Sequence, residues 1–405
     1  MSPDLVSAAL SLPGTLRFLK SIGRDLKAGI SLFILYPAIM DAVGLKQSIR
    51  DYLEMEAYLK IDRLDISGQN GEAFSLLRKE YPTLGTYPYL EKAVMDSNLP
   101  DVILVEGLEE CAEKTQLNWV KTMERWAEGC RSSGSMHCLA FLVAADKMDL
   151  SQLPEKDVRL AYRVWAGMPS ALEVRMLCRD YYEETNAENR WREYLLASLS
   201  GNDLLLCEKL WDVVQKNEMD VFGALKQHGI ELGWNEGNIQ KRYQGWRPRS
   251  PGTELKLSPK EHTFHLLSAG FTVYTPEYGE EIHPSALAVM NRVDDLRHRL
   301  WRAQAALILP LIDDFRHRIC SIMTARHGQK WIPPDMANLM ELGELNSIFY
   351  GLSNASWEKK QWGKGIEKTL DIRNKLAHYT PITFNEFYQF WLLNQSVHNM
   401  LYEIN

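Results

Sequence analysis

The sequence lacks the features that mark secreted, disulfide-bonded and membrane proteins. Its six cysteines are scattered and none forms a Cys-x-x-Cys pair, so we expect free thiols in a reducing compartment. No charged segment followed by an apolar core opens the chain, so we expect no signal peptide. The most apolar stretch, residues 30–40, is far shorter than the roughly 20 residues of a membrane span. These absences predict a cytoplasmic protein that does not contact a membrane.

The sequence also lacks the motifs of several common chemistries. It contains no Gly-x-Ser-x-Gly, no His-Glu-x-x-His and no Gly-x-Gly-x-x-Gly, which argues against the hydrolases, zinc proteases and dinucleotide enzymes that use them. His262 and His265 are three residues apart, but no acidic or cysteine partner follows at ligand spacing. We therefore expect neither a metal site nor a cofactor.

Excess positive charge is absent overall, since the formal net charge is −7. The distribution is uneven, however. Residues 283–405 hold 14 Lys and Arg against 12 Asp and Glu, a net of +2, and six of the ten histidines, whereas residues 1–282 carry a net of −9. A polyanion is therefore tolerated better at the C-terminal end of the chain.

The first 180 residues alternate short apolar runs with amphipathic segments, a pattern typical of an α/β domain with a mainly parallel sheet. We expect strands over 31–36, 61–67, 102–106 and 139–144, with helices over 45–58 and 115–127. The strand 102–106, VILVE, ends in Glu106 and so places a carboxylate at the carboxyl edge of the sheet, where α/β proteins form their sites.

The remainder of the chain is expected to be helical. Residues 181–282 form a helical region with a Gly- and Pro-rich linker at 245–252, and a short helix near 262–269 precedes residues 283–405. An apolar stripe from Val289 to Ile322 predicts one long helix that Pro310 kinks or splits. Further helices are expected over 339–352, 366–378 and from a cap at Thr383 to about 401. Four or more helices in about 120 residues predict a bundle.

Residues 373–378, RNKLAH, combine side chains that suit phosphodiester cleavage without a metal. A histidine with a pKa near neutrality can accept or donate a proton at the 2′-hydroxyl or the leaving oxygen, so we assign His378 this role. Arg373 can hold the phosphate through two hydrogen bonds, and Asn374 can orient either partner. On an ideal helix Arg373 and His378 lie about 140° apart, so one copy alone does not aim both at one phosphate. The alternative is an ordinary helix end with an exposed arginine and a histidine near the negative pole of the helix dipole.

This segment and the YTPITF that follows it resemble the signature of HEPN-domain ribonucleases. Residues 300–304, the acidic helix at 341–344 and Asp371-Ile372 fit the same family, and the resemblance covers about 30% of the chain. It implies a four- to five-helix bundle, dimeric, that cuts RNA without metal in a cleft between two copies. By this resemblance Arg373, Asn374 and His378 are the catalytic residues.

The N-terminal α/β region resembles AAA+ or STAND-type P-loop ATPases, with Glu106 at the position of the Walker B acid. The phosphate-binding motif is missing, because residues 36–48 read YPAIMDAVGLKQS. Pro37 and Ile39 stand where flexible glycines are needed, and Asp41 adds negative charge where phosphate would lie. The resemblance therefore implies a degenerate P-loop fold that does not hydrolyse ATP.

An internal echo, DDLRHR at 294–299 and DDFRHR at 313–318, lies within the expected long helix. Its acids precede its bases by three or four residues, which predicts ion pairs on a solvated helix face. A second interpretation is a track that contacts the RNA backbone. The residues of that track would be the arginines Arg297, Arg299, Arg316 and Arg318.

These observations support two functions. The first is a metal-independent RNA endonuclease that dimerises through its C-terminal bundle. A non-hydrolysing N-terminal sensor domain governs it, and we expect a regulatory protein partner. Family resemblance places such a protein in bacterial anti-phage defence or among toxins. The second is a non-enzymatic scaffold that uses both domains to bind proteins.

Overall fold

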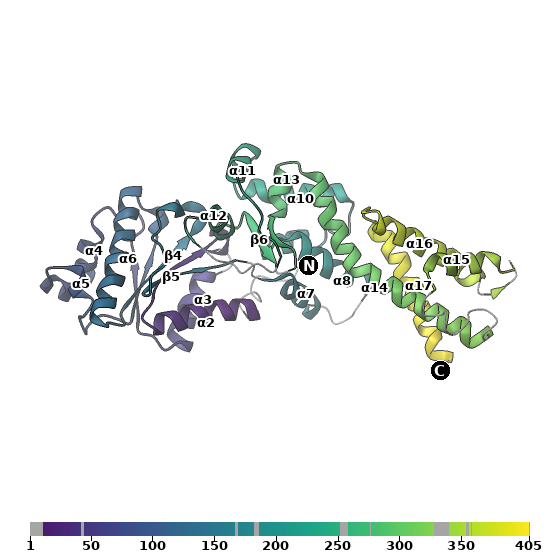
Figure 1. The fold of residues 1–405 in the computed structure, drawn as a ribbon, viewed down its shortest axis with the longest axis horizontal. Coiled ribbons are helices and arrows are strands. Elements are labelled where there is room, and N and C mark those ends of the chain that lie inside the picture. The colour runs from purple at the N-terminus through teal and green to yellow at the C-terminus, as the bar shows by residue number, and fades with distance from the viewer. Residues whose placement is uncertain are drawn as a thin grey trace. The chain divides into compact units, whose positions relative to one another are not determined.

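The computed structural model describes most of the chain (Figure 1). The described residues are 11–41, 44–166, 169–181, 186–251, 258–275, 277–327, 340–353, 356–357 and 359–404. Within them, no helix combines the length and the apolar character that crossing a membrane requires. Contacts divide the chain into an α/β unit, Asp4–Glu173 with Glu236–His283, and a helical unit, Val174–Asn235 with Pro284–Asn405. The expected middle region, 181–282, is thus divided between the two units.

A five-stranded parallel sheet forms the centre of the α/β unit. Its strands are β1 Ser31–Tyr36, β2 Ile61–Asp65, β3 Val102–Glu106, β4 Cys138–Ala144 and β5 Leu160–Val164. They follow the order β2-β3-β4-β1-β5, and every neighbouring pair is parallel. The strands β1, β3 and β4 are buried along their whole length, which explains why their sequences are apolar runs without alternation.

Alternation along β1 divides the sheet into two covered faces. Phe33 and Leu35 belong to a buried cluster that includes Trp119 and Trp126 of the long helix α6, so these side chains face α6. The helix α2 packs against β1 as well, and the residues of β1 that lie outside this cluster point to the opposite face. The sheet is therefore a middle layer between helices (Figure 1).

The helices of the α/β unit mostly connect consecutive strands. They are α2 Pro13–Lys27, α3 Leu45–Asp51, α4 Ala73–Glu80, α5 Leu90–Ala93, α6 Glu113–Ser133, α11 Glu236–Arg242 and α12 His262–Ser268, and π-helix η2 Tyr52–Glu56 extends α3. Short 3-10 helices are η1 Ala38–Asp41, η3 Pro82–Thr86, η4 Leu108–Glu110, η5 Ala145–Lys147 and η6 Leu150–Gln152. An antiparallel hairpin, β6 Thr272–Thr275 with β7 Gly279–Ile282, completes the unit.

The helical unit is built around one long helix, α14 Val293–His327. Its other helices are α7 Ala171–Asp180, which begins at the boundary, α8 Ala187–Leu199, α9 Leu204–Leu210, α10 Glu218–Glu231, α13 Pro284–Val289, α15 Leu342–Gly351, α16 Lys364–Ala377 and α17 Phe384–Ile404, with π-helix η8 Lys359–Gly363 before α16. The helix α14 contacts α8, α13, α16 and α17, and it buries the expected stripe, including Leu300, Phe315 and Ile319.

The coarse architecture predicted from the sequence, a parallel sheet followed by a largely helical region, is confirmed. Strand β5 and the hairpin β6–β7 were not expected. Strand β5 lies at the edge of the sheet and is only alternately buried, and its short sequence LAYRV carries little signal. The hairpin β6–β7 has only four residues in each strand. Short strands of this kind give too few residues for a periodic pattern to be seen.

Of the two outcomes expected at Pro310, a kink or a split of the long helix, the split does not occur. The helix α14 is continuous from Val293 to His327 with Pro310 inside it. A proline removes one backbone hydrogen bond and crowds the preceding turn, but packing on both sides can outweigh that cost. Leu307 and Ile308 before it, and Ile312 after it, are all buried. Tertiary packing therefore overrides the local preference.

Candidate functional site

The helix α16 ends in a tight reversal that immediately follows the RNKLAH segment. His378 is its C-cap, and the backbone N–H of His378 donates to the carbonyl oxygens of Asn374 (3.0 Å) and Lys375 (3.1 Å). The next two N–H groups fold back: Tyr379 donates to Leu376 (3.3 Å) and Thr380 to Lys375 (2.9 Å). This pair of bonds is a Schellman motif, which satisfies the last carbonyls of the helix. The backbone thus fixes where His378 lies.

Two side chains of α14 anchor this reversal. The indole N–H of Trp301 donates to the carbonyl oxygen of Leu376 at 2.6 Å. Buried Gln304 bonds the backbone of Ile382 twice, accepting from its N–H (2.8 Å) and donating to its carbonyl oxygen (2.9 Å). Beyond Ile382, Thr383 caps α17 as expected, because its hydroxyl accepts from the N–H of Glu386. The segment carrying His378 is therefore held at both ends.

Arg373 lies one turn before the helix end and is partly exposed, with 44% of its side chain accessible. One guanidinium nitrogen donates to the side-chain oxygen of Asn374 at 3.3 Å, and another lies 3.5 Å from a carboxylate oxygen of Glu341, the N-cap of α15. Arg373 also lines a pocket of about 380 Å³ with Asp313 and Arg316 of α14. The structure therefore brings Arg373 and Asn374 together.

The side chain of His378 is exposed, and none of the described residues bonds it or pairs with it. Within the described parts of this single chain, no hydrogen bond links the side chains of Arg373 and His378. This agrees with the separation of about 140° expected for five helical steps. The arginine and the amide form one group, and the histidine stands apart from them.

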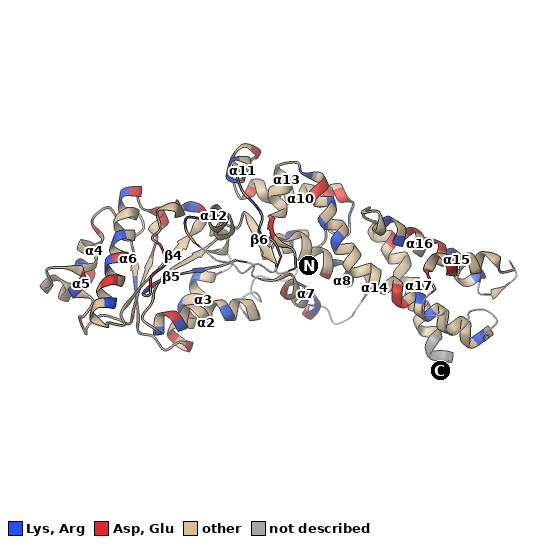
Figure 2. Cartoon of the chain, viewed as in Figure 1, with Lys and Arg blue, Asp and Glu red and all other residues tan. Residues whose placement is uncertain are grey.

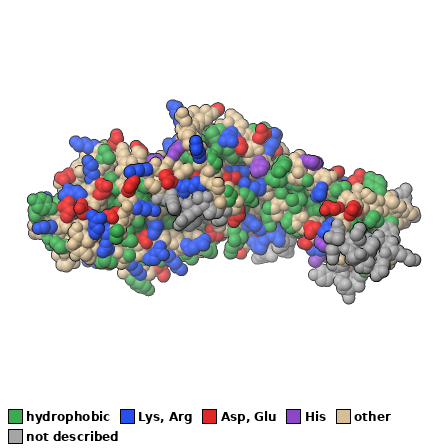
Figure 3. All heavy atoms as spheres, in the orientation of Figure 1, with side chains coloured by type: hydrophobic (Ala, Val, Ile, Leu, Met, Phe, Trp, Pro, Cys, Tyr) green, Lys and Arg blue, Asp and Glu red, His purple; other side chains and the backbone are tan. Residues whose placement is uncertain are grey.

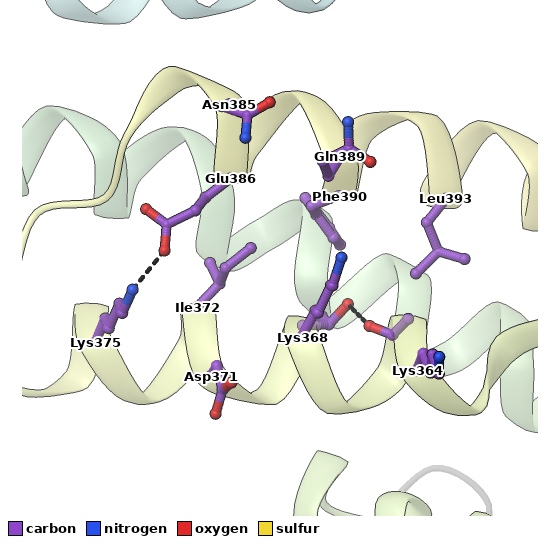
Figure 4. Close-up of a pocket in the computed structure, with 12 residues that line it drawn as sticks. Lys364, Lys368, Asp371, Ile372, Lys375, Asn385, Glu386, Gln389, Phe390 and Leu393 are labelled. Atoms are coloured by element: carbon purple, nitrogen blue, oxygen red, sulfur yellow. Dashed lines mark hydrogen bonds and ion pairs between the residues drawn. The ribbon is translucent and has the colours of Figure 1, made fainter. Parts of the chain in front are cut away.

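A groove of about 390 Å³ lies between helix α16 and helix α17 (Figure 4). Lys364, Lys368 and Lys375 line it from α16, at helical spacings that place them on one side. Figure 4 shows Lys368 extending toward Gln389 and Phe390 of α17. Lysines in such a row can contact successive phosphates of a nucleic acid backbone. This row of lysines was not among the residues expected to bind RNA, although its spacing is visible in the sequence.

Glu386 neutralises one end of the groove through an ion pair with Lys375 (Figure 4). Partial burial raises the pKa of Glu386, but hydrogen bonds from Lys375 and from the backbone and hydroxyl of Thr383 lower the pKa by more. The net effect is a lowered pKa, so this carboxylate stays ionised at neutral pH. Lys364 and Lys368 are the lysines of the groove for which no ion pair is found among the described residues.

The four arginines of the α14 echo differ in accessibility. Arg297 pairs with Glu218 at 2.7 Å and is half exposed, while Arg318 lies 3.9 Å from Asp314 and donates to Asn394. Arg316 pairs with Asp313 at 2.8 Å and donates to a backbone carbonyl. The pairs of Arg316 with Asp313 and of Arg318 with Asp314 have the expected spacing of three or four residues, whereas the nearer acid to Arg297 is Glu218 of α10 rather than Asp294, at 3.9 Å. Arg299 is only 4% exposed, so a phosphate would have to enter the packed interior to reach it.

Glu106 lies at the carboxyl end of β3, as expected for a sheet-edge acid. It is 9% exposed, and Arg50 of α3 binds both of its oxygens, one through Nε at 2.8 Å. Arg63 adds a further contact at 3.6 Å. The carboxylate is thus satisfied within the protein. Sequence reasoning identified Glu106 but not its partner, because Arg50 lies on the helix after a different strand.

A second cluster of ion pairs, one lysine between two carboxylates, lies at the same edge of the sheet. The ammonium nitrogen of Lys46 is 3.5 Å from a carboxylate oxygen of Asp41 and 3.8 Å from a carboxylate oxygen of Glu109. Burial raises the pKa of Glu109, and burial, with Asp41 and Glu109 nearby, raises the pKa of the Tyr36 hydroxyl well above its usual value. The backbone N–H of Ala38 donates to Asp146 at 2.7 Å. Cations that could hold a phosphate here are already paired with carboxylates.

Charge is mixed over both units. Figures 2 and 3 show Lys and Arg interspersed with Asp and Glu, and the face drawn in Figure 3 has no continuous basic area. Among the described residues, no three or more His, Cys, Asp and Glu side chains gather closely enough to hold a metal ion.

Neither a protein-family model nor a curated protein matches this chain.

Proposed function

We propose that the C-terminal bundle is a metal-independent RNA endonuclease of the HEPN type. The observation that supports it most directly is the end of α16. There an arginine and an amide are hydrogen-bonded to each other, and an exposed histidine follows on a backbone fixed by the Schellman motif and by α14. Exposed basic groups on a fixed backbone are what a phosphodiester substrate requires.

The proposed chemistry assigns one role to each side chain. His378 removes the proton from a ribose 2′-hydroxyl, and that oxygen attacks the adjacent phosphorus. The bond to the 5′-oxygen breaks, and this leaving oxygen takes up a proton from water, so the products are a 2′,3′-cyclic phosphate and a 5′-hydroxyl. The protonated imidazole of His378 then releases its proton to water. Arg373 stabilises the negative charge that develops on the phosphate oxygens, and Asn374 holds the guanidinium in place.

We infer that the complete site needs two copies of the chain. On an ideal helix Arg373 and His378 would lie about 140° apart, and no hydrogen bond or ion pair joins their side chains within the described chain. A two-fold axis near the end of α16 would let the arginine of one copy serve the histidine of the other. Such a dimer would also bring the lysine row of each copy, which includes Lys364 and Lys368, toward one RNA strand.

For the α/β unit we propose a degenerate P-loop domain that regulates the bundle without hydrolysing ATP, in association with a partner protein. Its strand order places β1 between β4 and β5, so connections leave the carboxyl edge in opposite directions beside β1. Ligands of open α/β sheets bind at such a point. Here the cations Lys46 and Arg50 are neutralised by internal acids, which disfavours phosphate binding. The family resemblance alone suggests that such a protein acts in bacterial anti-phage defence or as a toxin.

The experiment that tests the nuclease is incubation of the purified protein with end-labelled RNA in EDTA. Cleavage that persists in EDTA and leaves 2′,3′-cyclic phosphate ends is expected for the wild type. His378→Ala should remove it, whereas His317→Ala, which removes another accessible histidine of the bundle, should not. Activity that disappears in EDTA and returns with Mg²⁺ would refute the mechanism. No cleavage under any condition would favour a scaffold.

The α/β proposal has its own test. The purified protein should show no ATP turnover above background, because no segment corresponding to a Gly-x4-Gly-Lys-Ser/Thr loop exists to hold phosphate. If turnover is measured and disappears in Glu106→Gln, then Glu106 acts on a nucleotide and the assignment of a non-hydrolysing domain is wrong.

A further inference from the structure

Tyr379, directly after His378, has a backbone conformation that tyrosine rarely adopts. Its φ is 58°, in the left-handed region that the Schellman motif requires at this position. Glycine is the usual residue there, because a Cβ atom is disfavoured in this region. The ring is 66% exposed, so burial of the side chain does not account for a tyrosine. Neither the helix end nor the core therefore explains why a large aromatic residue stands here.

The ring of Tyr379 extends an aromatic cluster on α14. Its centroid lies 4.5 Å from the ring of Trp301, at an interplanar angle of 52°, and 6.4 Å from the ring of His298, at 27°. His298 and Trp301 are themselves 5.3 Å apart. His298 is exposed and Trp301 is half buried, with its N–H fixed on the carbonyl oxygen of Leu376. Three rings are thus gathered, and two of them are open to solvent.

We propose that His298, Trp301 and Tyr379 form an aromatic platform that stacks a base of single-stranded RNA beside His378. This inference rests on the proposed nuclease function for the identity of the ligand. Proteins hold unpaired bases by stacking them on aromatic rings, and this stacking tolerates any base. Tyr379 adjoins His378 in the chain, so a base on the platform places its ribose near the histidine.

The platform specifies the kind of RNA that is cut. In a duplex each base is stacked between its neighbours, and its faces are not available to a protein ring. A single-stranded loop or tail offers those faces. We therefore expect single-stranded RNA to bind more tightly than a duplex of the same length, with little preference for one base over another.

The test is binding of a fluorescein-labelled single-stranded RNA to protein that carries His378→Ala, so that the RNA stays intact. On this background Tyr379→Phe keeps the ring and should bind as before. Tyr379→Leu and Tyr379→Gly should weaken binding by about 5- to 150-fold, the range for loss of one stacked base. Tyr350→Leu removes another exposed tyrosine of the bundle and is the matched control.

The glycine variant separates ligand binding from structure. Glycine suits the φ of 58° better than tyrosine, so Tyr379→Gly should unfold at the same or a higher urea concentration while binding RNA less tightly. Unchanged RNA affinity in Tyr379→Gly and Tyr379→Leu overturns the platform, as does the absence of any single-stranded RNA binding. Equal losses for Tyr350→Leu and Tyr379→Leu also overturn it.

The outcomes for the platform and for the nuclease are distinguishable. Binding that depends on the Tyr379 ring, without cleavage by the wild-type protein, keeps the platform and refutes the nuclease. Cleavage that is indifferent to the Tyr379 ring does the reverse. Duplex RNA that binds as tightly as single-stranded RNA, with the same dependence on Tyr379, contradicts base stacking.

Discussion

The polar clusters around Glu106 and around the end of α16 each contain an arginine, and they differ in how its charge is satisfied. At the carboxyl edge of the sheet, Arg50 is bound by both oxygens of Glu106, and the side chains are only 14% and 11% exposed. At the end of α16, Arg373 is 44% exposed and meets Glu341 at 3.5 Å with a single nitrogen. A buried, bidentate pair is saturated, whereas an exposed, single contact is readily exchanged for a ligand. An arginine near a sheet edge or a helix end therefore does not by itself indicate a ligand-binding site. Its charged partners within the protein must be known as well.

The largest expected effect comes from the exposed cluster. Arg373→Ala and His378→Ala should each lower RNA cleavage by about 10²- to 10⁴-fold, because one loses the phosphate clamp and the other the proton shuttle. Unfolding in urea should change little, since both side chains are exposed. If the site is shared by two copies, mixing the two inactive variants should restore up to about a quarter of the activity, as half the dimers would be mixed and carry one intact site.

Sedimentation velocity at micromolar concentration checks the same dimer directly. A strictly monomeric protein that cuts RNA at full rate would contradict a shared site. Mixing two samples of the same variant is the control, since no combination of identical defects can rebuild an intact pair of residues.

The buried cluster should respond in stability. Arg50→Met leaves Glu106 without its main partner, and removing one member of a buried pair costs about 3–5 kcal/mol of unfolding free energy. Adding Glu106→Leu should recover much of that loss, because no uncompensated charge remains. Arg131→Met is the matched control: its pair with Asp157 is close, at 2.6 Å, but the side chains are 48% and 39% exposed. It should cost less than about 1 kcal/mol. Equal costs for the two variants in urea titrations would show that burial does not distinguish them.

A smaller effect is expected at the cap of α17. Thr383→Ala should lower the unfolding free energy by about 1 kcal/mol, because the N–H of Glu386 loses its acceptor. Thr380→Ala, whose hydroxyl makes one 3.4 Å contact, is the control. The pKa of Glu386 is lowered in the folded protein, so its carboxylate stabilises the fold above about pH 4.5 and this contribution is lost as the pH falls further. The wild type should therefore lose part of its advantage over Thr383→Ala below pH 4. A constant difference at all pH values would exclude a role for the Glu386 carboxylate.

The smallest effect tests how loosely Arg373 is held. Glu341→Gln removes the charge that competes with phosphate but keeps an oxygen to accept from the first turn of α15. Exposed pairs contribute about 0.2–1 kcal/mol, so RNA affinity should rise by about 1.4- to 5-fold. Glu344→Gln, the other acid of the same capping box, is the control. Weaker RNA binding in Glu341→Gln would mean that the glutamate orients Arg373 rather than competing with the ligand.

Local patterns in the sequence were sufficient for much of the fold. The runs that became β1, β3 and β4 are apolar throughout because both faces of those strands are covered, and the stripe of α14 is visible because one face of a helix is buried. The cap at Thr383 and the end of α16 were predicted from residues next to them in the chain. Strand β5, the hairpin and the continuity through Pro310 were not, because they depend on neighbours that are distant in the sequence.

The candidate residues show the same division. The sequence by itself determined that Arg373, Asn374 and His378 stand at a helix end, that Glu106 ends a strand, and that the arginines of α14 follow acids at pairing distance, since each depends on spacing along one element. Only the tertiary structure decided that Arg50 saturates Glu106, that Arg299 is buried, and that Trp301 and His298 stack beside Tyr379. The first and the last are contacts between elements that are far apart in the chain, and the burial of Arg299 depends on the helices that pack around it. The spacing of residues along one element does not reveal such contacts.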